Sequence, residues 1–191
     1  MLITQHKNMT TLIIIDMQAG LFTKDKPRHN SENVISNINT LAEAVRKNSG
    51  RVIFIQHNDP AGELFERGSD AWQLLPTLER LPDDKIVHKT ACDSFYRSEL
   101  KSVLDADKTG SLIITGCATD FCVDTTLRAA LSYDYNIVAA SDGHTTNAKP
   151  YADAETIIEH HNYLWQNLVH PVLQVKVMQT SEIVDTLAKK L

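Results

Sequence analysis

The chain has 191 residues, of which 42% are hydrophobic and 23% are charged, so it is long enough and apolar enough to bury one sizeable core. Its net charge of -5 gives no basic field, and no signal-peptide pattern or apolar run of membrane-spanning length occurs, so neither nucleic acid nor a membrane is an expected partner. The three cysteines show no CxxC or cysteine–histidine pairing, which argues against a disulfide framework and a structural zinc site.

Strand and helix patterns alternate along the chain. The continuous β-branched run at 11–15 predicts a strand buried on both faces of a parallel sheet. Apolar residues at helical spacing predict a helix over 31–48, with Ser31 as its N-cap. The same reasoning predicts strands at 51–56, 85–88, 112–114, 136–140 and 172–177, and helices at 98–105, after Thr119, at 153–168 and at 181–191.

Repeated β-α units of this kind predict an α/β fold with three layers, α/β/α. The sheet is expected to be six-stranded and mostly parallel, in the Rossmann-like order 3-2-1-4-5-6. We expect a single domain over residues 1–191, in the cytoplasm. The connection from 57 to 84 is long for a compact domain, and connections of that length usually serve a function.

The cysteine at position 122 lies where a helix is expected to begin. Thr119 is a candidate N-cap, which would put Cys122 in the first turn, close to unpaired backbone N–H groups and the positive end of the helix dipole. Both features favour a thiolate, so we expect a nucleophilic sulfur with a pKa below its ordinary value. A buried structural cysteine is the alternative interpretation.

Two further residues that can take part in catalysis follow predicted strands. Asp16 comes directly after the first strand and Lys89 directly after the third. Because the carboxyl ends of parallel strands meet at one edge of a sheet, both are expected near Cys122. Taken singly, Asp16 could be an exposed turn residue and Lys89 a solvated residue at the end of a strand. Together they supply the acid, cation and nucleophile that nucleophilic catalysis requires.

Three segments carry a resemblance to a known family: IIIDMQAGLF at 13–22, KTACDSFYRSEL at 89–100 and LIITGCATDFCVDTTLRAA at 112–130. In these segments, and in strand context from 11 to 143, the chain resembles the isochorismatase-like cysteine hydrolases, which include nicotinamidase and N-carbamoylsarcosine amidase. The resemblance implies that Asp16 is the general base, that Lys89 orients and stabilises charge, and that Cys122 attacks.

The same resemblance implies an oxyanion hole and a reaction. The hole would consist of the backbone N–H groups of Ala118 and Cys122, with a cis peptide bond between Cys117 and Ala118. The implied reaction is cleavage of a C–N bond in a small amide or ureido substrate through a thioester acyl-enzyme.

The chain departs from the nicotinamidase pattern after the second strand. Nicotinamidases carry an Asp-x-His there and a further histidine, which bind a divalent metal. This chain has Gln56-His57-Asn58-Asp59 instead. A single imidazole without further metal ligands beside it makes a poor metal site. We therefore expect no metal and no other cofactor, which favours the metal-free amidase and ureide branch.

Candidates for the substrate pocket come from the loops and strand ends on the same edge of the sheet, although core packing is an equal alternative for the aromatic ones. They are Phe22, Gln56, His57, Trp72, Phe95, Tyr96 and His144. Beyond a small-molecule substrate, a second copy of the chain is an expected partner. Ile157, Leu164, Trp165 and Leu168 recur at helical spacing and offer an apolar face for a homo-oligomer, or a face that covers the sheet.

Two other functions stay open at this point. Isochorismatases of the resembled family hydrolyse a vinyl ether without a cysteine nucleophile, and the presence of Cys122 speaks against that chemistry. A catalytically silent binding or assembly module with the same fold is the second alternative.

Overall fold

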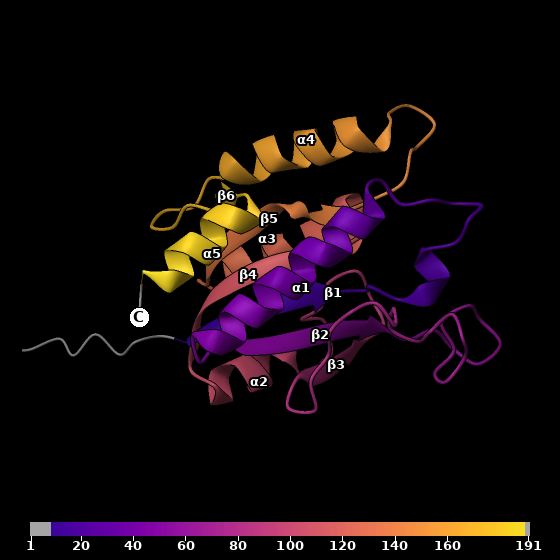
Figure 1. The fold of residues 1–191 in the computed structure, drawn as a ribbon, viewed down its shortest axis with the longest axis horizontal. Coiled ribbons are helices and arrows are strands. Elements are labelled where there is room, and N and C mark those ends of the chain that lie inside the picture. Colours follow the sequence, from indigo (N-terminus) through magenta and orange to yellow (C-terminus); the bar gives the residue numbers. More distant parts are fainter. Residues whose placement is uncertain (1–8, 190–191) are drawn as a thin grey trace, which may run out of the picture.

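The computed structural model describes residues 9–189 as a parallel β-sheet covered by helices on both faces (Figure 1). All neighbouring strands pair in parallel, and their order is β3-β2-β1-β4-β5-β6, which confirms the order expected from the sequence. The strands are β1 (Met9–Ile15), β2 (Arg51–His57), β3 (Lys85–Lys89), β4 (Thr109–Cys117), β5 (Asn136–Thr145) and β6 (Lys176–Met178).

The helices divide between the two faces of the sheet. Helices α1 (Ser31–Lys47) and α5 (Thr180–Ala188) pack on one face. Helices α2 (Leu100–Ala106), α3 (Asp124–Ser132) and α4 (Ala154–Gln166) contribute to the core on the other. Two short segments complete the set, a 3-10 helix η1 (Ala19–Leu21) and a π-helix η2 (Thr119–Val123).

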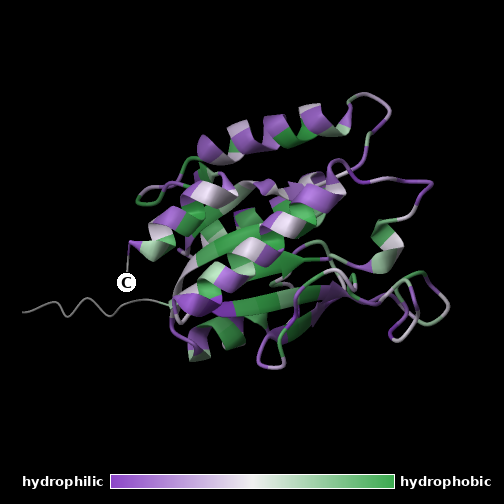
Figure 2. Ribbon diagram, viewed as in Figure 1, coloured by the Kyte–Doolittle hydropathy of each residue, from purple (hydrophilic) through white to green (hydrophobic). Residues whose placement is uncertain are grey.

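The alternation of side chains along β1 explains why this sheet needs two helical layers. Leu12 and Ile14 belong to the core beneath α1 and α5, whereas Ile13 and Ile15 belong to the core on the opposite face. Successive residues of a strand point to opposite faces, so a continuous apolar run must be covered twice. Figure 2 shows the strands as the most hydrophobic part of the fold and the helices as half polar.

The junction of β1 with β4 brings two strand ends into close contact. Gly116 is paired with Ile15 and has φ 120, and a Cβ on this residue would lie 2.2 Å from the carbonyl oxygen of Ile15. Only glycine fits this position without displacing the backbone. The small size of Gly116 lets β4 pair with β1 up to its last residue, Ile15. Strand β4 accordingly extends to Cys117, beyond the predicted 112–114.

Several element boundaries differ from the sequence predictions, and three of them concern a cap or the edge of the sheet. The N-cap of α1 is Asn30, which takes a left-handed conformation with φ 50, and not Ser31. The helical segment after β4 starts at Thr119 with Ala118 as the N-cap residue, so the capping role expected for Thr119 is wrong. Strand β6 is limited to Lys176–Met178, because it pairs with only three residues of β5, while the predicted range began at 172. No helix within 9–189 has the length and apolar character needed to cross a membrane.

Candidate active site

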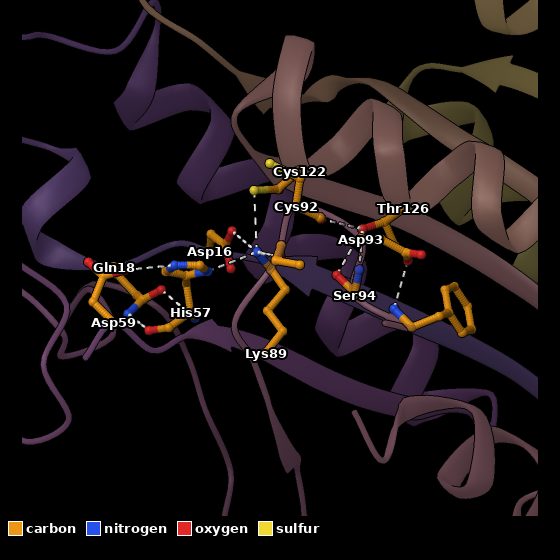
Figure 3. A network of polar contacts seen from close by, with 12 residues as sticks. Asp16, Gln18, His57, Asp59, Lys89, Cys92, Asp93, Ser94, Cys122 and Thr126 are labelled. Carbon is orange, nitrogen blue, oxygen red and sulfur yellow. Dashed lines mark hydrogen bonds and ion pairs between the residues drawn. The ribbon is translucent and has the colours of Figure 1, made fainter. Parts of the chain in front are cut away.

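The strand order reverses between β1 and β4, and in open α/β sheets ligands bind beyond the carboxyl ends of the strands at that point. Asp16 follows β1, Lys89 is the last residue of β3, and Cys122 lies in the π-helix η2 after β4. Their side chains point toward one another (Figure 3). The structure thus brings together the three residues that the sequence placed at one edge.

Lys89 is the centre of this cluster. Its Nζ lies 2.7 Å from Oδ2 of Asp16 and 3.3 Å from Sγ of Cys122, and it also donates to the carbonyl oxygen of Ala91 at 2.9 Å. Nδ1 of His57 is a fourth acceptor at 3.4 Å. An ammonium has three N–H donors, so the sulfur and the imidazole compete for one of them. Lys89 is only 2% exposed, and a charge this deeply buried requires such pairing.

Burial and pairing act in opposite directions on the two charged groups. Burial raises the pKa of the Asp16 carboxyl above its ordinary value, and the nearby ammonium of Lys89 opposes this only in part. Burial would lower the pKa of Lys89, but the charge of Asp16 and the hydrogen bonds to Asp16 and Cys122 outweigh burial, and the pKa of Lys89 is raised. Lys89 is therefore held as an ammonium, and Asp16 is a stronger base than an exposed carboxylate.

The electrostatics of Cys122 differ from the sequence prediction. Burial raises the pKa of its thiol, the negative charge of Asp16 raises it further, and the ammonium of Lys89 does not compensate. The expectation of a lowered pKa is wrong, because the sequence showed the start of a helix but not the burial or the carboxylate beside it. The sulfur rests as a thiol and needs a base. Oδ1 of Asp16 is buried and has no hydrogen-bond partner among residues 9–189, so a lone pair is free for that proton.

The turn between β4 and η2 carries the backbone groups that the resemblance assigned to an oxyanion hole. The peptide bond between Cys117 and Ala118 is cis, as the resemblance implied. The N–H of Ala118 donates to no acceptor within the described residues. Both Ala118 and Cys122 line a cavity of about 320 Å³. A larger cavity of about 560 Å³ lies near Arg51, at the opposite end of β2, and contains none of the three clustered side chains.

His57 lies in the wall of this cavity and is paired with a residue that the sequence analysis did not select. Its Nε2 is 3.0 Å from Oδ1 of Asp59, and the backbone N–H of Phe65 donates to Oδ2 of Asp59 at 3.0 Å. Because a carboxylate only accepts, Nε2 carries the proton and Nδ1 turns its lone pair toward Lys89. The only sequence signal for Asp59 was its place two residues after His57, at the start of the long loop.

Gln18 also belongs to the cavity wall and was missed. It fastens the start of the long loop, because its Oε1 accepts from the backbone N–H of His57 at 2.8 Å while its Nε2 donates to the carbonyl oxygens of His57 and Trp72. Gln56 donates to the same Trp72 oxygen at 2.8 Å. Gln56 and Trp72, both expected in the pocket wall, therefore hold the loop against the strands and do not line the cavity.

Three aromatic candidates for the pocket lie elsewhere. Phe22 packs against the core beneath α1. Phe95 is buried in the opposite core, where its ring contacts the rings of Tyr133 and Tyr135. Tyr96, next along the chain, is 49% exposed and lies away from the cavity. Cys92 lines the cavity, but the chain then turns to α3, where Ser94 and Thr126 form a hydrogen bond at 2.8 Å, and the sequence pattern did not reveal this path.

His144 contacts η2, the segment that carries Cys122, and does not line the cavity. Its Nδ1 is 2.8 Å from Oγ1 of Thr119, and its Nε2 is 3.0 Å from Oδ1 of Asn162. Burial lowers the pKa of His144 to about 4, so the ring is neutral and joins η2 to α4 through hydrogen bonds without charge.

A doubly wound α/β sheet with a thiol, an ammonium and a carboxylate at its switch point defines the class: an α/β protein with a candidate cysteine nucleophile. Residues 10–170 match the family model of the Isochorismatase domain. The chain belongs to this family and is an isochorismatase-family hydrolase. Within 9–189 no group of three or more histidine, cysteine, aspartate or glutamate side chains is placed to hold a metal ion.

The similar proteins agree with this assignment. The isochorismatase family protein YrdC of Bacillus subtilis is 29% identical over 152 residues, which is 76% of this chain and 81% of that protein. A crystal structure of an isochorismatase family protein has 30% identity and a TM-score of 0.79, covering 87% of this chain and 96% of that one. Ureidoacrylate amidohydrolase RutB of Caulobacter vibrioides is 39% identical over 74 residues, which span 39% of this chain and 33% of that enzyme.

Proposed function

We propose that this protein is a cysteine hydrolase that cleaves the C–N bond of a small amide or ureido compound through a thioester acyl-enzyme. The observation that carries the proposal is the position of the Lys89 ammonium, 2.7 Å from Asp16 and 3.3 Å from Cys122, beside a cavity that Asp16 and Cys122 both line. Similarity to an amidohydrolase that acts on ureidoacrylate supports a substrate of this chemical kind.

The first step is attack of sulfur on the substrate carbonyl carbon. Asp16 accepts the thiol proton as the S–C bond forms, and the pair of electrons of the carbonyl π-bond moves to oxygen. The raised pKa of Asp16 brings it closer to the working pH of a general base. Lys89 stays charged throughout and keeps the sulfur and the carboxylate in register through its hydrogen bonds.

The negative oxygen of the tetrahedral intermediate needs donors that are already in place. The backbone N–H groups of Ala118 and Cys122 are the proposed pair, at the turn where β4 meets η2. Ala118 lines the cavity and its N–H is not used within the described part of the chain. One such donor is worth about 3 kcal/mol of transition-state stabilisation.

Collapse of the intermediate breaks the C–N bond. Asp16 returns its proton to the departing nitrogen, so ammonia or an amine leaves and the acyl group remains on sulfur as a thioester. Water then attacks the thioester while Asp16 takes its proton, and the acid product and free thiol are released. Each proton that Asp16 accepts is delivered before the next turnover begins.

A panel of small amides and ureides, screened for ammonia or amine release, tests the proposal. At least one compound should be turned over, with and without EDTA, since His57 and Asp59 bind each other and the proposed steps use no metal. A quenched reaction should show the acyl mass on the peptide that contains Cys122. Turnover of a substrate by the Cys122→Ala variant at more than a tenth of the wild-type rate would contradict the mechanism.

A further inference from the structure

The cavity has a cationic side chain that the proposed chemistry does not use. Arg28 lies in the loop between η1 and α1 and lines the same 320 Å³ cavity as Cys122. No carboxylate of residues 9–189 forms an ion pair with it. A guanidinium at the wall of a partly enclosed cavity without a counter-ion attracts an anion, because few waters compete for its donors there.

Arg28 is held in place by neutral oxygens. Its Nε donates to the carbonyl oxygen of Leu21 at 2.8 Å, and Nη1 donates to Oδ1 of Asn147 at 2.6 Å. The next residue in the chain, His29, is fixed to the end of β5, since its backbone N–H donates to the Thr146 carbonyl at 2.9 Å and its own carbonyl accepts from Oγ1 of Thr145 at 2.6 Å. The position of the guanidinium is therefore set before any ligand binds.

The guanidinium keeps unused donors. An arginine side chain has five N–H groups in a planar fork that matches the two oxygens of a carboxylate. Two of them are engaged by Leu21 and Asn147, and the remaining three have no acceptor in the described part of the chain. The nearby ammonium of Lys149 differs, because it is already paired with Asp120 at 3.1 Å.

Besides Asp16, the cavity wall contains two charged residues, Asp59 and Arg28, which lie near the ends of different strands. Asp59 follows β2, and both of its oxygens accept hydrogen bonds, from His57 and from the backbone of Phe65. Arg28 is attached to Asn147, just beyond β5. Cys122, after β4, comes from the strand between β1 and β5 in the sheet. An anionic substrate would thus be repelled at the β2 side and held at the β5 side, with Leu21, Phe65 and Phe121 as its apolar surroundings.

We propose that Arg28 binds a carboxylate of the substrate, so that the compound hydrolysed is an amide or ureido acid and not a neutral amide. The substrate class rests on the function proposed above, whereas the anion site itself does not. Fixing the carboxylate at Arg28 orients the carbonyl toward Cys122 and selects against uncharged compounds of the same size.

Matched alkylating agents test the anion site without any turnover. Iodoacetate and iodoacetamide differ in charge but little in size, and each forms an S–C bond with Cys122 as iodide leaves and the thiol proton is lost. The rates are followed by peptide mass spectrometry at mildly alkaline pH, in a Cys92→Ser background because Cys92 also lines the cavity. Arg28→Gln should lower the iodoacetate-to-iodoacetamide rate ratio by about tenfold or more, as expected for a charge-assisted hydrogen bond.

Two further variants separate anion binding from a loop-fastening role. Arg28→Lys should keep part of the ratio, and Lys149→Gln, which removes a paired cation, should leave it within about twofold. Equal loss of both rates in Arg28→Gln would show that the residue only holds the loop and would overturn the proposal. An equal fall of the ratio in Lys149→Gln would also overturn the proposal, because the effect would then come from the overall positive charge near the cavity and not from a contact with Arg28.

Hydrolysis assays then test the substrate class. An N-carbamoyl amino acid should be turned over with a lower KM than its carboxamide, and Arg28→Gln should raise KM for the acid alone. A shifted alkylation ratio with no turnover of any ureide would count against the proposed function and leave the anion site standing. Preference of the wild-type enzyme for the carboxamide would overturn the substrate class.

Discussion

At Asp16, one carboxylate serves two neighbours with opposite requirements. It neutralises the buried ammonium of Lys89 and, in the proposed mechanism, receives the proton of a thiol whose pKa is raised. A buried pair of this kind is costly to break from one side, because the partner is left charged and without a counter-ion. The proposed mechanism therefore couples catalysis and stability at Asp16 but not at Cys122, which is partly accessible and carries no charge at rest.

This difference gives a prediction for two variants. Asp16→Asn should lower turnover by about 10²–10⁴-fold, the usual contribution of a general base. It should also destabilise the fold by about 3–5 kcal/mol, because Lys89 loses its counter-ion. Cys122→Ala should be inactive, yet its unfolding temperature should lie within a few degrees of that of the wild type. Thermal and denaturant unfolding, measured beside turnover, check the pair, and equal stability of the two variants would contradict the coupling.

His144 predicts a pH dependence of stability with a defined sign. Burial lowers its pKa to about 4 from 6.5. Between these values the unfolded chain binds a proton that the folded chain does not, so stability falls as pH decreases from 6.5 toward 4. The loss that belongs to His144 is about 3 kcal/mol over that interval. Denaturant unfolding across this pH range should show a smaller slope in His144→Gln, whereas His160→Gln, at an exposed ring on α4, should keep the wild-type slope.

At the scale of elements, the sequence was informative where hydrophobicity alone determines structure. The apolar run of β1 had to be a strand covered on both faces, and Asp16 directly after it had to lie at the carboxyl edge. Lys89 followed in the same way from β3. These placements depend only on the local pattern and on the parallel topology, so they could be predicted without knowing any contact.

Residues whose role depends on the path of a loop could not be predicted. Arg28 and Gln18 are held at the cavity by hydrogen bonds to residues far along the chain, such as the bond from Arg28 to the side chain of Asn147, 119 positions away. Asp59 is held by its loop, through the backbone N–H of Phe65. The raised pKa of Cys122 is of the same kind, since it arises from burial and from Asp16, and neither can be read from the residues around Cys122. Sequence periodicity carries no information on such long-range pairs.

The contact of β4 with β1 gives a prediction at this scale. Gly116→Ala should cost about 3–5 kcal/mol, because φ 120 strains any side chain and the new Cβ would lie 2.2 Å from the Ile15 carbonyl oxygen. Gly68→Ala is the matched control. Gly68 has φ 95, but nothing lies within 4 Å of the position of its Cβ, so only backbone strain of about 1–2 kcal/mol should appear. Equal losses in the two variants, measured by denaturant unfolding, would mean that the close approach of the strands contributes nothing.

At the scale of the whole molecule, the structure changes the argument for self-association. The apolar stripe of α4 faces inward: Trp165 is fully buried, Ile157 is nearly so, and Leu168 packs against the core. These three residues cover the sheet, and of the predicted face Leu164 alone is half-buried outside both cores, which leaves too little apolar area on this face for an oligomer contact. The expectation of a homo-oligomer stays a prediction and needs other apolar surface.

Such surface lies at the end of α4 and in the segment that follows. The exposed fractions of the side chains are 67% for Tyr163, 97% for Val169 and 79% for Val172. Three exposed apolar side chains so close in sequence are typical of a surface that contacts another protein. We expect a homodimer at micromolar concentration, measured by light scattering, and a shift to monomer in Val169→Lys, which would place a charge within the contact. Leu64→Lys, at a side chain 57% exposed in the long loop, should leave the mass unchanged. A monomer mass for the wild-type chain would rule out the dimer, and an unchanged dimer in Val169→Lys would move the contact to another surface.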